Sequence, residues 1–368
     1  MTLTGDMLSF LLCSCHLLHS MRISMFLPAL AATITNAAYP GDIVQYWVDQ
    51  SAILLRAVLP AIGVDATSPS GLRAIEIGRK AARTVIAARA DDGINNFVDY
   101  IPKPAAPGAY QATPGGQPVP DTPQAEFIRL FGGVGDVTRF RAPAPPAPGS
   151  AEFETALNYV KTQGARNSTI RKAYDTETAY FWKESSPIGW NRLAHAVIGN
   201  SLATDVKASA KFYAQLNYAL ANAAIASWDS KYFYNTWRPI TAIRYPTTYL
   251  KSGKSVTDPV WDPLLLPTPN HQDYLSTHAT FAGAAGAVIR AWNGGDKVNV
   301  THSSNVTVDS IGVITRRITS IAAAVKANGD SRIFGGIHFQ YASDQGSKIG
   351  DWVGRETLAK FDSHWNDF

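Results

Sequence analysis

Residues 273–288 read Asp-Tyr-Leu-Ser-Thr-His-Ala-Thr-Phe-Ala-Gly-Ala-Ala-Gly-Ala-Val. The Ala- and Gly-rich part, 279–288, has the composition of a helix that packs closely against its neighbours. Ser276 and Thr277 are good N-cap residues for this helix, and the free N–H groups at its start form a seat for an anion. His278 at the same end can donate or accept a proton, with a pKa that depends on the anion beside it. An ordinary capping turn with a surface histidine is the simpler interpretation.

Helical apolar spacing extends over most of the chain. It predicts helices over 43–62, 72–90, 151–163, 169–184, 204–228, 279–288, 308–327 and 345–361. No alternating pattern of useful strand length appears. The predicted fold class is therefore all-α, a helical bundle with polar loops.

Proline divides the chain into parts. Eleven of the 22 prolines lie in residues 102–148, which therefore form neither a helix nor a central strand. This stretch is either a flexible tether or an ordered coil wrapped around the helices. The predicted organisation is a leader over 1–38, N-terminal helices with a Pro-rich excursion over 39–150, and the main helical domain over 151–368.

The N-terminus has the features of a secretory signal that starts at Met21. Arg22 supplies a positive flank, 23–34 is a short apolar stretch, and 35–37 is a small-residue cleavage site. A buried N-terminal helix is the alternative. Three glycosylation sequons also favour export, at Asn167, Asn299 and Asn305. We therefore expect a secreted glycoprotein.

The composition excludes several classes of function. With 46% apolar and 17% charged residues, the chain is neither disordered nor a coiled coil. Its formal charge of +4 is too small and too scattered to indicate a nucleic-acid partner, and no apolar run is long enough for a membrane span. Both cysteines, Cys13 and Cys15, lie in the first fifteen residues, so the rest of the chain has neither a disulfide nor a thiolate metal site.

Two further polar clusters lie on either side of the small-residue helix. The first, Lys-Tyr-Phe-Tyr-Asn-Thr-Trp-Arg-Pro at 231–239, has a Lys and an Arg two turns apart on one predicted helix face, where both can reach one anion. Pro239 then ends or kinks that helix. The second, Ser-Arg-Ile-Phe-Gly-Gly-Ile-His at 331–338, has two glycines that allow a ligand close to the backbone while Arg332 and His338 converge on it. Solvated surface charges and a core histidine are the simpler interpretations.

Together the three clusters resemble the vanadium haloperoxidases and the type 2 acid phosphatases. The family's pattern is Lys-x6-Arg-Pro, then Ser-x-His ahead of a small-residue helix, then Ser-Arg-x5-His. This chain has the same order, with 35 residues between Pro239 and Leu275 and 52 between His278 and Ser331. The resemblance covers roughly residues 165–360.

The resemblance implies a site for vanadate, which phosphate can also occupy. Three cations, Lys231, Arg238 and Arg332, would bind the oxygens of the anion and offset its charge. Ser276 and the backbone N–H of Thr277 would add neutral donors.

The resemblance also implies separate roles for two histidines, a lysine and a carboxylate. His338 would ligate vanadium, or attack phosphorus in a phosphatase, and His278 would be the general acid–base on the opposite side. Lys231 would polarise bound peroxide. Asp344 would orient His338 through its second ring nitrogen.

The chain departs from the family's pattern at two positions. The family has a glycine where Thr277 stands, and a β-branched residue is strained there if that glycine has a positive φ. The family's carboxylate four residues after the metal-binding histidine is also missing. Ala342 occupies that position, and Asp344 lies two residues further on.

The implied activity is oxidation of halide by hydrogen peroxide to hypohalous acid, which reacts with a small organic acceptor. Export and the nearby aromatic residues Trp228 and Trp237 favour this activity. The alternatives are an acid phosphatase or phosphotransferase that uses phospho-His338, since the motif serves both, and a non-enzymatic secreted glycoprotein with a degenerate anion pocket. Neither a nucleic acid nor a membrane is expected as a partner, and the oligomeric state is left open.

Halide preference is predicted from His271, seven residues before His278. In the resembling family, bromide-selective members tend to have His at this position, whereas chloride-oxidising members have Phe. An imidazole there adds polarity and a proton-sensitive group, which favours bromide over chloride. Trp228 is closer to the chloride-oxidising pattern, and an exposed loop histidine is the alternative for His271.

Overall fold

The computed structural model describes residues 60, 65–308 and 311–364. The predicted leader, both cysteines and the predicted helix over 43–62, apart from Pro60, lie outside the described residues. In the part of the chain that the structure describes, no helix is long and apolar enough to cross a membrane.

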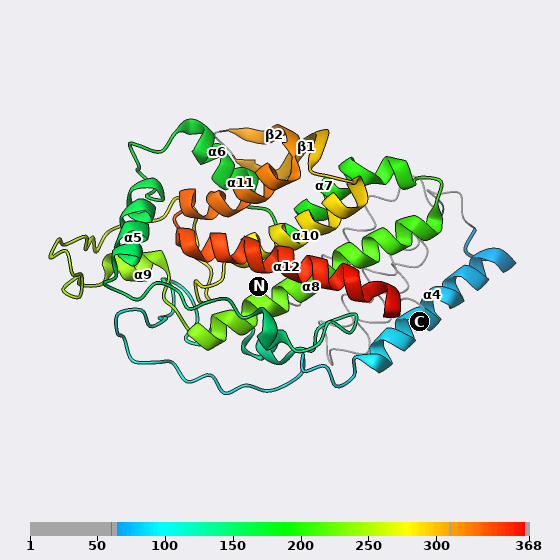
Figure 1. Cartoon of the computed structure of the whole chain (residues 1–368), viewed down its shortest axis with the longest axis horizontal. Helices are drawn as coiled ribbons and strands as arrows, with labels where there is room; N and C mark the ends of the chain where they lie inside the picture. Colours follow the sequence, from blue (N-terminus) through cyan, green and yellow to red (C-terminus); the bar gives the residue numbers. More distant parts are fainter. Residues whose placement is uncertain (1–59, 61–64, 309–310, 365–368) are drawn as a thin grey trace.

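Helices make up most of the described chain (Figure 1). In chain order they are α4 (Pro69–Ala88), α5 (Ala151–Gln163), α6 (Ala173–Phe181), α7 (Ser186–Ile198), α8 (Val206–Tyr234), α9 (Pro239–Arg244), α10 (Thr277–Asn293), α11 (Ile321–Phe334) and α12 (Gln340–His364). Three short 3-10 helices are η2 (Pro123–Phe127), η3 (Val137–Phe140) and η4 (Gly199–Leu202). The predicted all-α class is confirmed, with one small antiparallel sheet as a minor addition.

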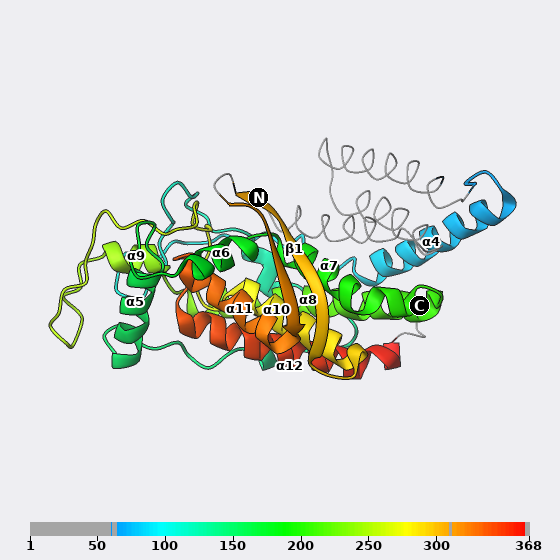
Figure 2. The same cartoon turned by 90° about the horizontal axis from the view of Figure 1, so that it is seen from above.

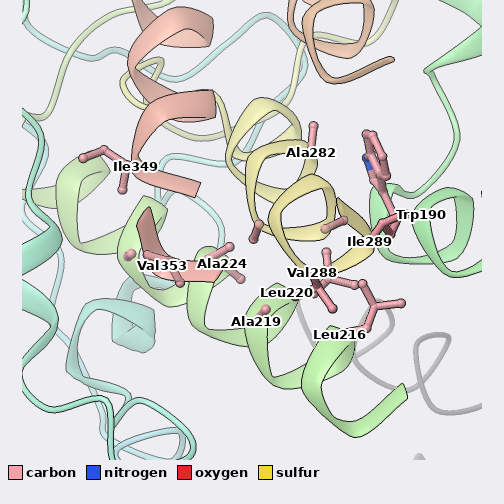
Figure 3. Close-up of a cluster of buried hydrophobic side chains, with 14 of the residues drawn as sticks. Trp190, Leu216, Ala219, Leu220, Ala224, Ala282, Val288, Ile289, Ile349 and Val353 are labelled. Carbon is pink, nitrogen blue, oxygen red and sulfur yellow. The ribbon is translucent and has the colours of Figure 1, made fainter. Parts of the chain in front are cut away.

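The small-residue helix α10 is the central element, because it contacts α7, α8, α11 and α12. Side chains from α7, α8, α10 and α12 meet in the main apolar core (Figure 3). They include Trp190, Leu216, Leu220, Val288, Ile289, Ile349 and Val353. Burial of these side chains, each contributing about 1.5–3 kcal/mol, holds the helices whose ends carry the polar clusters.

Helices α10 and α12 pack closely because glycines of one face the backbone of the other. Gly346, Gly350 and Gly354 recur at every fourth residue of α12, and each faces a carbonyl oxygen of α10 or of its N-cap. A Cβ on Gly350 would overlap the carbonyl oxygen of Thr280. We refer to these three residues and the α10 backbone opposite them as the glycine seam.

The Pro-rich stretch 102–148 is an ordered coil that packs on the helices, with η2 and η3 as its short helical turns. Tyr110, Leu130 and Phe140 are buried. The Tyr110 N–H donates to the carbonyl of Asn235, 2.9 Å away, directly after α8. The coil is therefore part of the packed structure near the candidate site rather than a tether.

The helix predicted over 308–327 is wrong up to Ser320, because α11 begins only at Ile321. An antiparallel hairpin of β1 (Lys297–Val308) and β2 (Gly312–Ser320) precedes α11 and packs on α6 and α7 (Figure 2). Buried Ile314 and Ile318 are four residues apart, a spacing that places side chains on one face of a helix or of a strand. Valine, isoleucine and threonine dominate β2 and favour the strand.

All three sequon asparagines are exposed, at Asn167, Asn299 and Asn305. Secretion itself stays a prediction, because the leader lies outside the described residues.

Replacing Gly350 by Ala is expected to lower the free energy of unfolding by about 1–3 kcal/mol, because the glycine seam must open to admit a methyl group. Gly329 in α11 is the matched control. An added Cβ there would lie 3.5 Å from the Ser343 Cβ, an ordinary contact, so Ala is expected to be neutral or to stabilise by up to about 1 kcal/mol. Urea denaturation of both variants measures the difference, and equal effects would contradict the seam.

Candidate oxyanion site

Six of the predicted site residues lie at or beside helix ends. They are Lys231 in the last turn of α8, Arg238 at the N-cap of α9, Ser276 at the N-cap of α10, His278 in the first turn of α10, Arg332 in the last turn of α11, and His338 between α11 and α12. The charges of the two arginines and the lysine act on the pKa of both histidines. The three sequence clusters therefore converge on one buried region, which we call the cage.

Lys231 and Arg238 reach the cage from different elements, contrary to the predicted common helix face. Helix α8 ends at Tyr234 because Asn235 adopts a left-handed conformation (φ 50°). Pro239 then begins α9 instead of ending a helix, since its fixed φ suits the first helical position.

Arg238 is fully buried and links the clusters. Its Nε donates to the carbonyl of His271 (2.7 Å), and its Nη1 donates to the carbonyl of Ile337 (2.7 Å). The same Nη1 lies 2.9 Å from Nε2 of His338. A guanidinium can only donate, so Nε2 of His338 accepts and its proton is on Nδ1.

Lys231 is held by a loop rather than by a carboxylate. Its Nζ donates to the carbonyls of Gln272 (2.7 Å), Asp273 (3.3 Å) and Leu275. All three ammonium protons therefore have acceptors in the loop just before α10. In this arrangement Lys231 anchors that loop and acts on the cage through its charge.

Arg332 is bonded to neutral groups. Its Nη2 donates to the carbonyls of Trp182 (3.0 Å) and Ala179 (3.3 Å), and its Nε donates to the Ser331 hydroxyl (2.9 Å). Among the described residues it has no carboxylate partner. Burial, followed by the charge of Arg238, lowers the pKa of Arg332 to about 9.

Positive charge in the cage exceeds the negative charge that the protein supplies. Asp273 is fully buried and its charge acts on both Lys231 and Arg238, while half-buried Asp121 acts on Arg238 alone. Burial raises the pKa of Asp273 to about 7, against the opposing effect of Arg238 and Lys231. Because unpaired buried cations are costly, this arrangement favours binding of an anion.

Neutral donors are available at the start of α10. The Ser276 hydroxyl is fully buried and has no hydrogen-bond partner within the described structure. Thr277 is the first helical residue, so its N–H is one of those without an acceptor inside the helix. Because its backbone is helical, the strain expected from a positive φ does not occur. Its hydroxyl lies 2.8 Å from that of Ser227. The orphaned hydroxyl and the cations fit a tetrahedral oxyanion.

His278 is held with its proton on a defined nitrogen. Its Nε2 lies 3.3 Å from the carbonyl oxygen of Glu184, which can only accept, so Nε2 carries the proton and Nδ1 has the lone pair. Burial, and then the charge of Arg332, lower the pKa of His278 well below its usual value. The side chain is therefore neutral near pH 7 and able to accept a proton at Nδ1.

The predicted contact between Asp344 and His338 is not formed. Asp344 is exposed and accepts a hydrogen bond from Gln340 Nε2 at 2.9 Å. Instead, Asp273 Oδ1 lies 2.8 Å from Nδ1 of His338. Sequence reasoning missed this partner because it comes from another segment. The one available signal was Ala342 at the position of the family's carboxylate.

His271 lies against the cage and not in an exposed loop. Arg238 Nη2 lies 2.9 Å from its Nδ1 and 3.3 Å from its Nε2, and its ring centroid is 4.9 Å from that of Trp228. Burial, and then the charges of Arg238 and Lys231, lower the pKa of His271 well below its usual value, so the imidazole is neutral rather than proton-sensitive near pH 7.

Two other expectations are corrected by packing. Trp237 is buried in a second core, with its ring 6.1 Å from that of Phe153, and so contributes to stability rather than to the cage. Gly336 (φ 76°) faces Gly164 and Pro263, where a Cβ would collide. Gly336 therefore allows close approach of backbone to backbone, and Gly335 makes room for the Leu265 side chain, so neither glycine faces a ligand.

Phosphate is expected to stabilise the folded protein, because it would neutralise cage cations that are dispersed on unfolding. Binding at 100 times Kd would contribute about 2.7 kcal/mol. It should also raise the pKa of His278, since a nearby negative charge favours the imidazolium. Thermal unfolding in phosphate and in chloride of equal ionic strength measures the first effect, and histidine NMR the second. Equal Tm values in the two salts would contradict the site.

This chain is similar to known proteins in sequence and in structure. Residues 211–367 match the family described as VCPO second helical-bundle domain. The vanadium chloroperoxidase of Curvularia inaequalis is 27% identical in a match that covers 40% of this chain and 28% of that protein. This chain therefore spans just over a quarter of that relative's length.

Solved structures share the fold of this chain over most of its length. A bacterial vanadium-dependent iodoperoxidase has a TM-score of 0.70 at 22% identity, covering 92% of this chain and 79% of that one. A bacterial vanadium-dependent chloroperoxidase in its holo form has a TM-score of 0.68 at 18% identity, covering 92% and 82%. The resemblance of the three clusters is thus confirmed: residues 211–367 match the VCPO second helical-bundle domain, and the chain has the vanadium haloperoxidase fold.

Proposed function

We propose that this protein is a vanadate-dependent haloperoxidase that uses hydrogen peroxide to oxidise halide to hypohalous acid. The observation that carries the proposal is the buried excess of positive charge from Lys231, Arg238 and Arg332 around Nε2 of His338. The likeness to proteins named vanadium chloroperoxidase and vanadium-dependent iodoperoxidase supports it.

The residues present fit vanadate. Arg238 and Arg332 would bind its oxygens, the Ser276 hydroxyl would donate to it, and His338 would ligate it through the Nε2 lone pair that Arg238 now holds. When bound, vanadate would supply a Lewis-acidic centre that activates hydrogen peroxide toward halide.

The remaining chemistry falls to groups of the chain itself. His278 would accept a proton at Nδ1, while the carbonyl of Glu184 keeps the other ring proton on Nε2. Lys231 would stabilise negative charge from the cage wall, and its bonds to the loop carbonyls would keep Ser276 in place. Burial of these groups in a medium of low dielectric constant strengthens each electrostatic effect.

Orthovanadate, hydrogen peroxide and bromide together are expected to brominate a phenolic dye in the presence of the protein, and omission of vanadate should abolish turnover. A parallel assay with a phosphate ester and no vanadate tests the phosphatase alternative. Hydrolysis of the ester without halogenation would establish the phosphatase. Absence of both activities would favour a non-enzymatic anion-binding protein.

Substitutions of the two histidines are expected to affect vanadate binding and turnover differently. His338→Ala should abolish stable vanadate binding, because it would remove the one side chain proposed to ligate vanadium. His278→Ala should retain binding and lower kcat by about 10²–10⁴-fold, the usual contribution of a general acid–base. Isothermal titration and steady-state kinetics measure the two quantities. Equal losses of vanadate affinity in both variants would show that the roles are misassigned.

We further propose bromide as the preferred halide, with little chloride oxidation. The neutral His271 ring occupies one N–H of Arg238 and packs on Trp228, so it adds a polar group to the cage wall beside the anion. His271→Phe would free that N–H and make the wall apolar, and it should raise the ratio of chloride to bromide turnover. Rates with chloride, bromide and iodide at mildly acidic pH measure the ratio. Strong chloride turnover by the wild type, unchanged in the variant, would contradict the role of His271.

A further inference from the structure

A buried carboxylate contacts the histidine of the cage. Asp273 Oδ1 lies 2.8 Å from Nδ1 of His338, and the two side chains are 1% and 4% exposed. Asp273 belongs to the loop before α10, and His338 lies 65 residues later, before α12. Such a pair persists in the interior only when its geometry is closely maintained, because each group loses its hydration.

The backbone of Asp273 is fixed from two directions. Its N–H donates to the carbonyl of Thr236 at 3.1 Å, and its carbonyl accepts from Lys231 Nζ at 3.3 Å. The main chain that carries the carboxyl group is therefore held by the segment after α8 and by the end of α8 itself, which keeps the carboxyl group beside His338.

The hydrogen bond at Nε2, on the opposite side of the His338 ring from Asp273, determines which ring nitrogen carries the proton. Arg238 Nη1 lies 2.9 Å from Nε2 and can only donate, so the ring proton is on Nδ1. Nδ1 is the nitrogen 2.8 Å from Asp273 Oδ1, a close contact that is not aligned as a hydrogen bond in the described structure. The lone pair of Nε2 consequently faces the cage cation. The imidazole is thus hydrogen-bonded to Arg238 at Nε2 and lies against Asp273 at Nδ1, and Nε2 is the atom available to an anion's central atom.

We propose that Asp273 is the positioning residue of His338: it accepts the Nδ1 proton and keeps the Nε2 lone pair directed into the cage. This inference rests on the proposed function of His338 as a ligand. In this chain the carboxylate comes from the loop that also carries Ser276, rather than from α12, where Ala342 is apolar and Asp344 is exposed. One loop, anchored by Lys231, would then position the Ser276 hydroxyl as a donor and also orient His338.

The test combines NMR of histidine-labelled protein with anion binding. In the ligand-free wild type, the proton on His338 Nδ1 should give a downfield signal that exchanges slowly with water. Asp273→Ala should lose this signal and bind orthovanadate about 10–100-fold more weakly, the usual cost of removing the partner of a metal-binding histidine. Asp344→Asn, the matched carboxylate control, should change neither.

Conservative variants separate positioning from stability. Asp273→Asn retains an acceptor without the charge, so it should keep the NMR signal and show an intermediate anion affinity. It also tests the proposal if Asp273→Ala does not fold. An unchanged signal and unchanged affinities in both Asp273 variants would overturn the proposal. If the signal depends on Asp273 but the wild type does not bind orthovanadate, the positioning role stands and the proposed function fails.

Discussion

The close backbone contact between α10 and α12 determines where the chemistry of this protein can be. The glycine seam brings the two helices together from their first turns onward, and the Ser276 N–H donates to the carbonyl of Ala342 at 3.0 Å, which joins their starts. Ser276 and His278 on one side and His338 on the other are placed by this contact. A larger side chain in the seam would separate the donors of the cage from its histidine.

The buried cations then require a negative charge that the described residues supply only in part. Lys231, Arg238 and Arg332 each donate to backbone carbonyls, which do not cancel their charge. Asp273 offsets part of that charge and is occupied by His338. Helix starts add further positive potential. The structure is therefore arranged for an anion, and burial of these cations costs stability, which is common at functional sites.

Much of this arrangement could be predicted from the sequence. Helix α5 spans the predicted residues 151–163. The residues of the cage stood out as three polar clusters, and the resemblance to a known family assigned these clusters to one oxyanion site. The hairpin was missed because a spacing of four serves both helix and strand. The end of α8 was missed because it depends on one left-handed asparagine. The Asp273–His338 contact joins distant segments, and no local pattern reports it.

The central claim, that the cage binds vanadate through His338, is most directly tested by crystallography with orthovanadate at the vanadium absorption edge. We predict one anomalous peak at bonding distance from His338 Nε2, with Arg238 and Arg332 within hydrogen-bond distance of its oxygens and His278 on the opposite side. A peak elsewhere, or an anion in the cage that makes no bond to His338, would contradict this mechanism.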